Sequence, residues 1–223
     1  MVWFGHSSYL MQVDGKIILV DPVLSGSASL IKFTTLSYKG SDVYTTDNFP
    51  TIDYLFITYE HLDHLDYKTI LKLKSKVKVI ITGLGTGAHL KHWRFNANNI
   101  IEKDWDQTIQ LHNGFAINTP QGRHFSGRGI KRNLALWMSF VLTTPTMKIF
   151  IDGDSNYDSH FKTIGDTYGP FDIAILECGQ YNNYWKYIHL MPEEVVLAGI
   201  DLQTKKLLPV HRAKFSLSLY AWD

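Results

Sequence analysis

Cysteine is nearly absent from this sequence, since Cys178 is the only one among 223 residues. A single cysteine cannot form a disulfide within the chain, and it excludes a structural zinc site built from several thiolates. Because Cys178 follows an apolar run at residues 171–176, we interpret it as a buried core thiol rather than a nucleophile. The shortage of cysteine fits a reducing compartment, and we predict a cytoplasmic protein.

Long apolar runs and a strong net charge are also lacking. No apolar run of about 18 residues occurs, and the first residues lack the basic and apolar regions of a secretory signal. The 22 lysines and arginines nearly balance the 21 aspartates and glutamates, which gives a net charge of +1. This balance argues against electrostatic binding to nucleic acid, and we expect no such partner. Peripheral contact with a membrane stays open, as does the oligomeric state.

The chain has the length of one domain. At 223 residues and 25.6 kDa it can bury a sizeable core, and no linker, repeat or low-complexity segment divides it. We therefore predict a single domain over residues 1–223. Residues 2–4 already have the pattern of a core strand, so we also expect that terminal segments are lacking.

Strand signals come first as hairpins and later alternate with helical patterns. Asp14-Gly15 predicts a tight hairpin turn, because this dipeptide readily takes positive φ angles. This order predicts an α/β/β/α sandwich of two mixed sheets flanked by helices. The long loop at residues 24–50 is either a substrate-facing flap or an irregular surface excursion. The expected strands cover residues 2–10, 11–20, 52–58, 77–81, 108–111, 115–118, 136–142, 148–151, 171–176 and 206–210, and the expected helices cover residues 67–74, 88–93, 157–164 and 193–198.

The densest group of metal-binding side chains lies in residues 57–66, directly after an expected strand. His61, Asp63, His64 and Asp66 place two imidazoles and two carboxylates within six positions. Imidazole and carboxylate suit Zn²⁺, Mn²⁺ or Fe, and the end of a strand holds such ligands rigidly. The alternative is an ordinary polar loop in which Asp63 or Asp66 caps the following helix.

Further polar side chains follow other expected strands. His124, Asp154 and His211 each stand at or near the end of a strand. His6 and Asp21 flank the first hairpin, and we interpret them as hydrogen-bonding supports of the metal loop rather than as direct ligands. The sequence therefore predicts a metal centre that is assembled from several strand ends.

This series of strand-end groups resembles the metallo-β-lactamase superfamily, whose hydrolases carry a His-x-His-x-Asp-His motif, a later histidine, a bridging aspartate and a final histidine. Segments along nearly the whole chain are similar to its N-acyl-phosphatidylethanolamine phospholipase D branch, namely residues 3–8, 124–128, 136–140, 169–172, 192–194 and 201–206. The resemblance implies an αββα hydrolase with two zinc ions. It also implies a ligand set in which one ion is bound by His61 and His124, the other by Asp63, His64 and His211, and both by the bridging Asp154.

Tyr59 stands where the family motif has its first histidine. Neutral imidazole binds zinc near pH 7, whereas a phenol with an ordinary pKa of about 10 must first lose its proton. Three outcomes stay open. Tyr59 ligates as a phenolate, or it leaves the first site weak, or a single ion is held by Asp63, His64, Asp154 and His211.

The resemblance implies a metal-dependent hydrolase, and we expect it to cleave a phosphodiester in a phospholipid or a related small molecule. Asp63 and Asp154 are the expected catalytic carboxylates, and His189 is expected to contact the phosphate. A capping or packing role is the alternative for His189, and Arg128 is a weaker candidate for phosphate contact. The competing functions are a lactonase or sugar-phosphate hydrolase of the same fold, and a degenerate metal-binding module in which Tyr59 has reduced turnover.

A lipid substrate would also need an apolar entry. The candidates are the loop at residues 24–50 and the aromatic residues Tyr181, Tyr184, Trp185 and Tyr187. We predict that these residues line a path for acyl chains.

Overall fold

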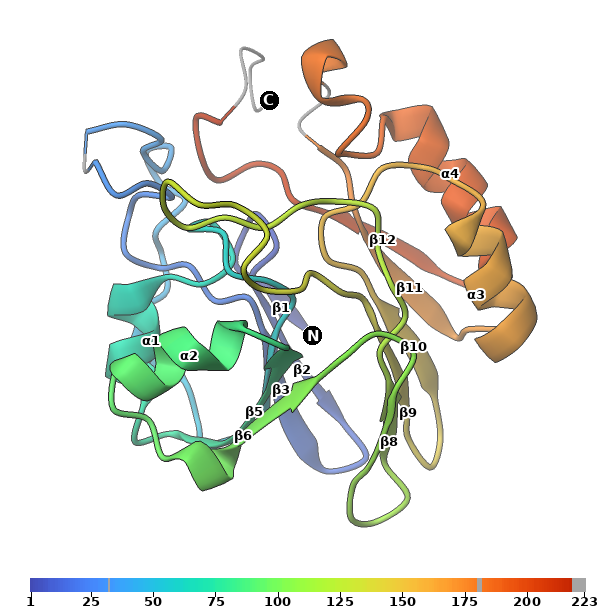
Figure 1. The fold of residues 1–223 in the computed structure, drawn as a ribbon, viewed down its shortest axis with the longest axis horizontal. Helices are drawn as coiled ribbons and strands as arrows, with labels where there is room; N and C mark the ends of the chain where they lie inside the picture. The colour runs from blue at the N-terminus through green and yellow to red at the C-terminus, as the bar shows by residue number, and fades with distance from the viewer. Residues whose placement is uncertain (32, 180–181, 218–223) are drawn as a thin grey trace.

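The computed structural model describes residues 1–31, 33–179 and 182–217. Two six-stranded sheets face each other across the core, and helices cover the outer face of each sheet (Figure 1). Each sheet joins an antiparallel part to a parallel part. The predicted αββα sandwich of two mixed sheets is therefore confirmed.

The first sheet is built from the N-terminal strands. In spatial order it contains β1 (Val2–Trp3), β2 (Tyr9–Val13), β3 (Lys16–Val20), β4 (Ile52–Ile57), β5 (Val77–Gly83) and β6 (Ile100–Lys103). Strands β1 to β3 are antiparallel, and β3 to β6 are parallel. The hairpin turn between β2 and β3 has φ angles of 45° at Asp14 and 75° at Gly15, as this dipeptide predicted.

The start of the chain differs from the sequence prediction. Strand β1 ends at Trp3 instead of reaching residue 10, because the chain turns through Gly5 and His6, whose φ angles are 85° and 53°. The backbone N–H of Phe4 bonds to the Ser8 carbonyl at 2.9 Å and closes the turn. Strand β6 has no counterpart in the prediction, since its residues are all half-buried and show no alternation.

Helices α1 (Tyr67–Leu73) and α2 (Thr86–His92) cover the outer face of the first sheet. They bury Ile70 and Leu90 against β4 and β5, and a fully buried side chain of this size contributes about 1.5–3 kcal/mol. Asp66 is the N-cap of α1, and its side chain accepts the backbone N–H of Lys68 at 3.2 Å. The capping interpretation is therefore right for Asp66, whereas Asp63 belongs to the centre described below.

The second sheet contains, in spatial order, β12 (Leu207–Val210), β11 (Ile173–Glu177), β10 (Lys148–Ile151), β9 (Phe140–Thr143), β8 (Ala116–Asn118) and β7 (Thr108–Gln110). Helices α3 (His160–Tyr168) and α4 (Pro192–Asp201) cover its outer face. Three short 3-10 helices lie in connecting segments, namely η1 (Thr46–Asn48), η2 (Ala97–Asn99) and η3 (Asn183–Trp185). In the described part of the chain, no helix has the length and apolar character needed to cross a membrane.

Two boundaries in the second half differ from the prediction. Strand β9 begins at Phe140 rather than at residue 136, because the backbone N–H groups of Leu136 and Met138 bond to carbonyls in the loops that follow β5 and β4. Helix α3 begins at His160 rather than at residue 157, since the preceding residues still belong to the loop that carries Asp154. Both shifts lengthen the loops at the edge of the sandwich where polar side chains gather.

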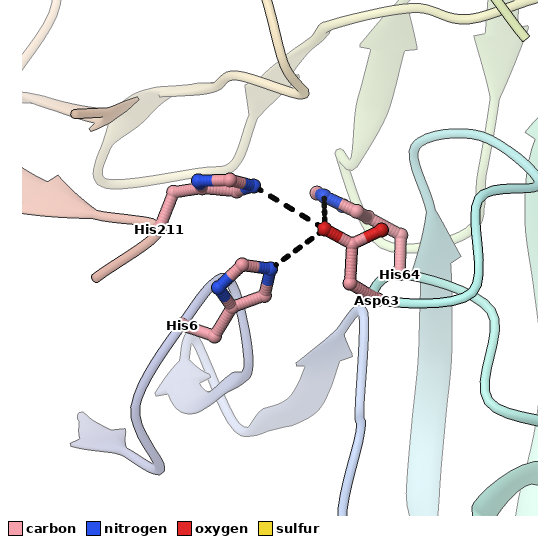
Figure 2. A group of neighbouring side chains, drawn as sticks. All are labelled: His6, Asp63, His64 and His211. Carbon is pink, nitrogen blue, oxygen red and sulfur yellow. Dashed lines mark hydrogen bonds and ion pairs between the residues drawn. The ribbon is translucent and has the colours of Figure 1, made fainter. Parts of the chain in front are cut away.

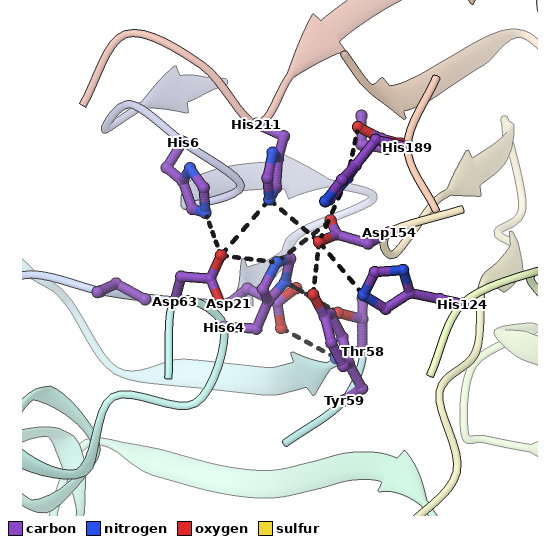
Figure 3. Close-up of polar contacts among 12 residues, drawn as sticks. His6, Asp21, Thr58, Tyr59, Asp63, His64, His124, Asp154, His189 and His211 are labelled. Carbon is purple, nitrogen blue, oxygen red and sulfur yellow. Dashed lines mark hydrogen bonds and ion pairs between the residues drawn. The ribbon is translucent and has the colours of Figure 1, made fainter. Parts of the chain in front are cut away.

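The core between the sheets is apolar. Phe56 and Phe140 pack edge to face with ring centroids 4.9 Å apart, and Ile18, Ile117 and Ile175 are fully buried around them. Because the interior has no place for unpaired polar groups, the polar residues that follow β4, β10 and β12 lie beyond its edge. These loops converge at that edge and form the candidate site (Figure 3).

Residues 24–31 and 33–50 are irregular except for η1. Isolated bridges pair Ser27 with Leu36 and Ser37 with Phe215, so the loop lies against the C-terminal segment. Leu30 in this loop is 71% exposed. The loop is therefore anchored at its base while apolar side chains face the solvent.

Candidate metal centre

The metal loop leaves β4 and is braced on both sides. Asp21 accepts the backbone N–H of Thr58 at 2.9 Å and the hydroxyl of the same residue at 2.6 Å. Arg128 donates to the backbone carbonyls of Glu60 and Leu65 at 2.9 and 2.6 Å. The side chains of the loop are therefore held in fixed directions. These contacts give Arg128 a bracing role, and its contact with phosphate stays a prediction.

Asp154 lies at the middle of the centre, in the loop that follows β10 (Figure 3). Its Oδ1 atom faces His64, and its Oδ2 atom faces the other groups. A buried carboxylate that presents its two oxygens to different partners has the geometry of a bridging ligand. The atoms around it are Tyr59 Oη at 2.5 Å, His211 Nε2 at 3.1 Å, His64 Nε2 at 3.2 Å, His189 Nδ1 at 3.8 Å and His124 Nε2 at 3.9 Å.

Asp63 gathers a second set of side chains (Figure 2). Its Oδ2 atom lies 3.1 Å from His6 Nε2, 3.6 Å from His211 Nε2 and 3.9 Å from His64 Nε2. One ligand atom from each of these four residues lies within 4.8 Å of the other three. Such separations suit neighbouring ligands of one ion, since a ligand atom stands about 2.0–2.2 Å from zinc.

The charges of the centre shift several pKa values. Burial opposes a charge on His64 and His211, but the carboxylates, Asp154 first among them, outweigh it and raise the pKa of His64 well above its usual range and that of His211 to about 10. Burial would raise the pKa of Asp154, yet His211 and His64 hold it well below its usual range. Protons on two histidines thus balance the carboxylates, and a divalent ion can supply the same positive charge in their place.

Several buried polar atoms of the centre have no hydrogen-bond partner within the described residues. Unpaired buried atoms are rare in folded proteins, and each one calls for an explanation. These atoms point toward the same small region, and imidazole nitrogen and carboxylate oxygen are suitable ligands for zinc, manganese and iron. The residues therefore fit a bound divalent metal ion. The unpaired atoms that belong to Asp154 or face it are Asp154 Oδ1, His64 Nε2, His124 Nε2, His189 Nδ1 and His211 Nε2, and His6 Nδ1 and His211 Nδ1 also lack a partner.

Asp21 supports the centre from behind. Its Oδ2 atom lies 2.8 Å from His64 Nδ1, and the residue is fully buried. A carboxylate in this position fixes the orientation and tautomer of a metal-binding imidazole and leaves Nε2 free to bind. The predicted bonding of Asp21 to this loop is therefore confirmed. His6 contacts Asp63 in a similar way through Nε2 at 3.1 Å.

Tyr59 occupies the centre as a hydrogen-bond donor. The residue is fully buried, and its hydroxyl donates to Asp154 Oδ2 at 2.5 Å. Burial, together with the charges of Asp154 and Asp63, raises the pKa of Tyr59 well above its usual range. The phenol therefore keeps its proton near neutral pH in the protein without metal, and its oxygen is engaged with the bridging carboxylate.

The other two members of the predicted first site stand further from Asp154. His124 Nε2 lies 3.9 Å from Asp154, and its Nδ1 is bonded to the Ile188 carbonyl at 2.9 Å. The ring centroid of His61 lies 4.5 Å from that of Tyr59, with the rings tilted by 57°, and 5.3 Å from that of His124, edge to face. Within the described residues, His61, His124 and Asp154 do not form a group whose ligand atoms all lie within 4.8 Å. The predicted second set thus forms a compact group, whereas His61 and His124 lie around Tyr59 without forming one, and both ligand sets stay predictions.

A family model described as "Beta-lactamase superfamily domain" matches residues 16–212. The chain belongs to this family. The domain is 36% identical over 224 residues to an uncharacterized protein of Mycobacterium tuberculosis, in an alignment that covers 99% of this chain and 60% of the relative. It is 27% identical to N-acyl-phosphatidylethanolamine-hydrolyzing phospholipase D 1 of Caenorhabditis elegans, with 94% of this chain and 62% of that protein covered. The predicted family resemblance is confirmed.

The fold of this β-lactamase superfamily domain also matches solved structures. Igni18, a metallo hydrolase from Ignicoccus hospitalis, superposes with a TM-score of 0.69 at 23% identity, covering 94% of this chain and 81% of that one. At this identity the likeness shows the fold alone. The chain spans about three fifths of the length of the curated relatives named above.

Glu177 is a residue of this superfamily domain that the sequence reasoning missed. It is the last residue of β11 and is 1% exposed, and its Oε2 atom lies 3.3 Å from His189 Nδ1. The signal that identified Asp154, an acidic residue at the end of an apolar strand, is present here as well. Its neighbour Cys178 is buried, as predicted.

A groove of 760 Å³ borders the metal loop of the domain at Glu60. Its wall includes the apolar residues Leu30, Trp93 and Leu134 and the cationic residues Arg128 and Lys131. Three of the aromatic residues predicted to form an acyl path, Tyr184, Trp185 and Tyr187, are not among the residues that line this groove, and Tyr181 lies outside the described residues. Tyr184 and Tyr187 are 88% and 67% exposed on the segment before α4.

Proposed function

We propose that this chain is a metal-dependent hydrolase that cleaves a phosphodiester in a phospholipid or a related molecule. The observation that carries the proposal is the convergence of the unpaired Nε2 atoms of His64 and His211 on the carboxylates of Asp63 and Asp154. Four ligand atoms held this closely by the loops after three separate strands are typical of a catalytic metal site.

Within this proposal, Asp63, His64, His211 and Asp154 would hold a divalent ion, for which zinc is expected. A bound ion of this kind makes hydroxide available near pH 7 and neutralises charge on a phosphate. Asp154 and Asp63 would hold the ion in place, and their carboxylate oxygens can accept a proton from the attacking water. Asp21 keeps His64 in place through the contact at 2.8 Å.

The groove beside the metal loop supports a substrate with both apolar and anionic parts. Leu30 and Leu134 are exposed apolar side chains at its wall, and Lys131 and Arg128 add positive charge. Burial of the two leucines favours the binding of an acyl chain, and the two cationic side chains attract a phosphate. This combination favours a phospholipid over a lactone or a free sugar phosphate.

The relatives support the same substrate class. Proteins of Caenorhabditis elegans and Saccharomyces cerevisiae that align over 94% and 97% of this chain are both named N-acyl-phosphatidylethanolamine-hydrolyzing phospholipase D. Their identities to this chain are 27% and 29%, and the chain spans 62% and 48% of their lengths. The names of these relatives therefore support a phospholipid as the class of substrate.

The experiment is an assay of zinc-loaded protein on bis(p-nitrophenyl) phosphate, on N-acyl-phosphatidylethanolamine and on a panel of lactones. We expect turnover of the two phosphodiesters, and we expect Asp63→Asn to lower kcat/KM by more than about 100-fold, beyond the usual effect of losing an outer hydrogen bond. Asp66→Asn is the matched control, because asparagine caps a helix as well as aspartate does. Faster cleavage of lactones would contradict the phosphodiester assignment.

A second candidate is a metal-binding module with little turnover. It is favoured by one observation, the engagement of Asp154 by the Tyr59 hydroxyl at 2.5 Å. In the same assay this candidate predicts bound zinc without hydrolysis of any of the substrates.

A further inference from the structure

The cluster around Asp154 continues beyond the ligands that the family motif accounts for. Asp154, Glu177, His189 and His211 each bring one ligand atom within 4.8 Å of the other three. They come from the ends of β10, β11 and β12 and from the segment that precedes α4. All four residues are at least nine-tenths buried, so their polar atoms have little access to water.

His189 points its Nδ1 atom into this cluster (Figure 3). The atom lies 3.3 Å from Glu177 Oε2 and 3.8 Å from Asp154 Oδ2, yet it has no partner of hydrogen-bonding geometry in the described part of the chain. A buried nitrogen that faces two carboxylates without a hydrogen bond is poorly explained by packing alone. A cation between the three groups would satisfy all of them.

The carboxylate of Glu177 is fixed in position by the backbone. Its Oε2 and Oε1 atoms accept the N–H groups of Gly179 and Leu190, each at 2.5 Å. Carboxylates that bind metals are commonly held by such outer hydrogen bonds. A Cβ atom at residue 179 would lie 2.5 Å from Cβ of His189, so only glycine lets the histidine come this close to Glu177.

The site that the family motif places on the other side of Asp154 is less complete. Tyr59 presents a hydroxyl that donates to Asp154 where the motif has an imidazole. His124 Nε2 and His189 Nδ1 lie at nearly the same distance from Asp154, 3.9 and 3.8 Å, but of the two only His189 belongs to a group in the described residues whose ligand atoms all lie within 4.8 Å of one another, and His61 belongs to none. A second ion therefore finds more suitable ligands on the Glu177 side.

We propose that this chain binds a second metal ion through Asp154, Glu177 and His189, in place of the site that Tyr59, His61 and His124 would form. Two carboxylates and one imidazole suit zinc, manganese or iron, and three protein ligands leave a position open for substrate. Asp154 keeps its bridging position, with Oδ1 toward His64 and Oδ2 toward His189. The inference rests on the proposed function for the other ion, and it shifts the metal pair toward the segment between β11 and α4.

The test is the zinc content per chain. The protein is stripped with a chelator, dialysed against Zn²⁺, passed over a desalting column and measured by elemental analysis. Glu177→Gln and His189→Ala probe the proposed site, while His61→Ala and His124→Ala are matched controls on the other side of Asp154. We expect two equivalents in the natural protein and in both controls, and a loss of one equivalent in Glu177→Gln and in His189→Ala.

A rescue variant sharpens the test. Adding Tyr59→His to Glu177→Gln supplies the missing imidazole of the family site, so we expect the zinc content to return from one equivalent to two. Circular dichroism checks that each variant is folded. If Glu177→Gln does not fold, His189→Ala decides the question, because Nδ1 of His189 makes no hydrogen bond within the described residues.

Three results would overturn the proposal. They are saturation of the natural protein at one equivalent, loss of the second equivalent in His61→Ala or His124→Ala alone, and equal loss in all four variants. Zinc content and turnover also separate this inference from the proposed function. Two zinc equivalents with the expected pattern among the variants, but without phosphodiester cleavage, would contradict the proposed function and support the second metal site. Phosphodiester cleavage by a protein with one zinc equivalent would support the proposed function and contradict the second metal site.

Discussion

The two sides of Asp154 differ in what stands beside the histidines rather than behind them. Asp21 lies 2.8 Å from His64 Nδ1, and the Ile188 carbonyl lies 2.9 Å from His124 Nδ1. On both sides an acceptor therefore orients the ring and leaves Nε2 without a hydrogen-bond partner in the described residues. On the Tyr59 side, however, the Tyr59 hydroxyl contacts Asp154 where the family motif has an imidazole. The comparison teaches that orienting an imidazole does not by itself make a metal site, because the neighbouring side chain decides whether the ligand set is complete.

The pKa values of the histidines on the two sides of Asp154 also differ. His211 and His124 are both buried, yet the pKa of His211 is raised to about 10 while that of His124 is lowered to about 3. Burial lowers both values, and the carboxylates near His211 reverse the effect there. Since a site that attracts protons this strongly also attracts metal cations, we expect the Asp63 side to bind the tighter ion.

The largest expected effect comes from removing a histidine on the Asp63 side. His64→Ala should lose about one zinc equivalent and lower kcat/KM by more than about 100-fold, because a direct ligand contributes more than an outer hydrogen bond. His61→Ala, three positions earlier in the same loop, should keep its zinc and stay within about 10-fold of the natural activity. Elemental analysis and steady-state kinetics on both variants check this, and the opposite ranking would break the comparison.

A smaller effect is expected from the support of His64. Asp21→Asn keeps the shape of the side chain but removes the charge that orients the imidazole, so zinc affinity should fall by about 10–100-fold. Competition with a chromogenic chelator measures this change. Asp53→Asn, which alters an aspartate on β4 that contacts Lys78 and the Ile17 backbone, is the control and should leave zinc affinity unchanged. An equal loss in both variants would mean that the effect is general rather than local.

The smallest expected effect is the pH dependence of stability in chelator-stripped protein. The raised pKa of His211 stabilises the fold below about pH 6.5, and this contribution is lost as the pH rises toward 10. The lowered pKa of His124 acts in the opposite direction, so its contribution is present above pH 6.5 and is lost as the pH falls toward 3. Urea unfolding at pH 5, 6.5 and 9 gives the free energy of unfolding as a function of pH. In His211→Gln this free energy should change less between pH 6.5 and 9 than in the natural protein, and in His124→Gln it should change less between pH 5 and 6.5. The same pH dependence of the unfolding free energy in both variants as in the natural protein would contradict these pKa shifts.

Much of the framework could be predicted from the sequence because it depends on local patterns. Asp14-Gly15 determined the first hairpin, and the apolar runs before Asp154 and His211 identified both as strand-end groups. Boundaries failed where distant partners decide them. Strand β9 starts late because the backbone of Leu136 bonds to that of Leu84, a contact that no local pattern of residues encodes.

The ligand set was harder to predict than the fold. Glu177 carried the same strand-end signal as Asp154, but its link to His189 depends on the close approach that Gly179 permits. The contact between Tyr59 and Asp154 joins residues that are distant in sequence, and its direction follows from the packing of three imidazole rings around the phenol. Sequence spacing contains neither fact.

The turn that carries His6 is tied directly to the segment that carries His211. The backbone N–H of His211 donates to the His6 carbonyl at 3.0 Å, and that of His6 donates to the Arg212 carbonyl at 2.8 Å. These bonds join two segments from opposite ends of the described chain, and contacts of such long range form late in folding. A ribosome therefore releases nearly the whole domain before the centre can exist. Capture of the proposed ion would therefore report that both of these segments have been synthesised and have packed together.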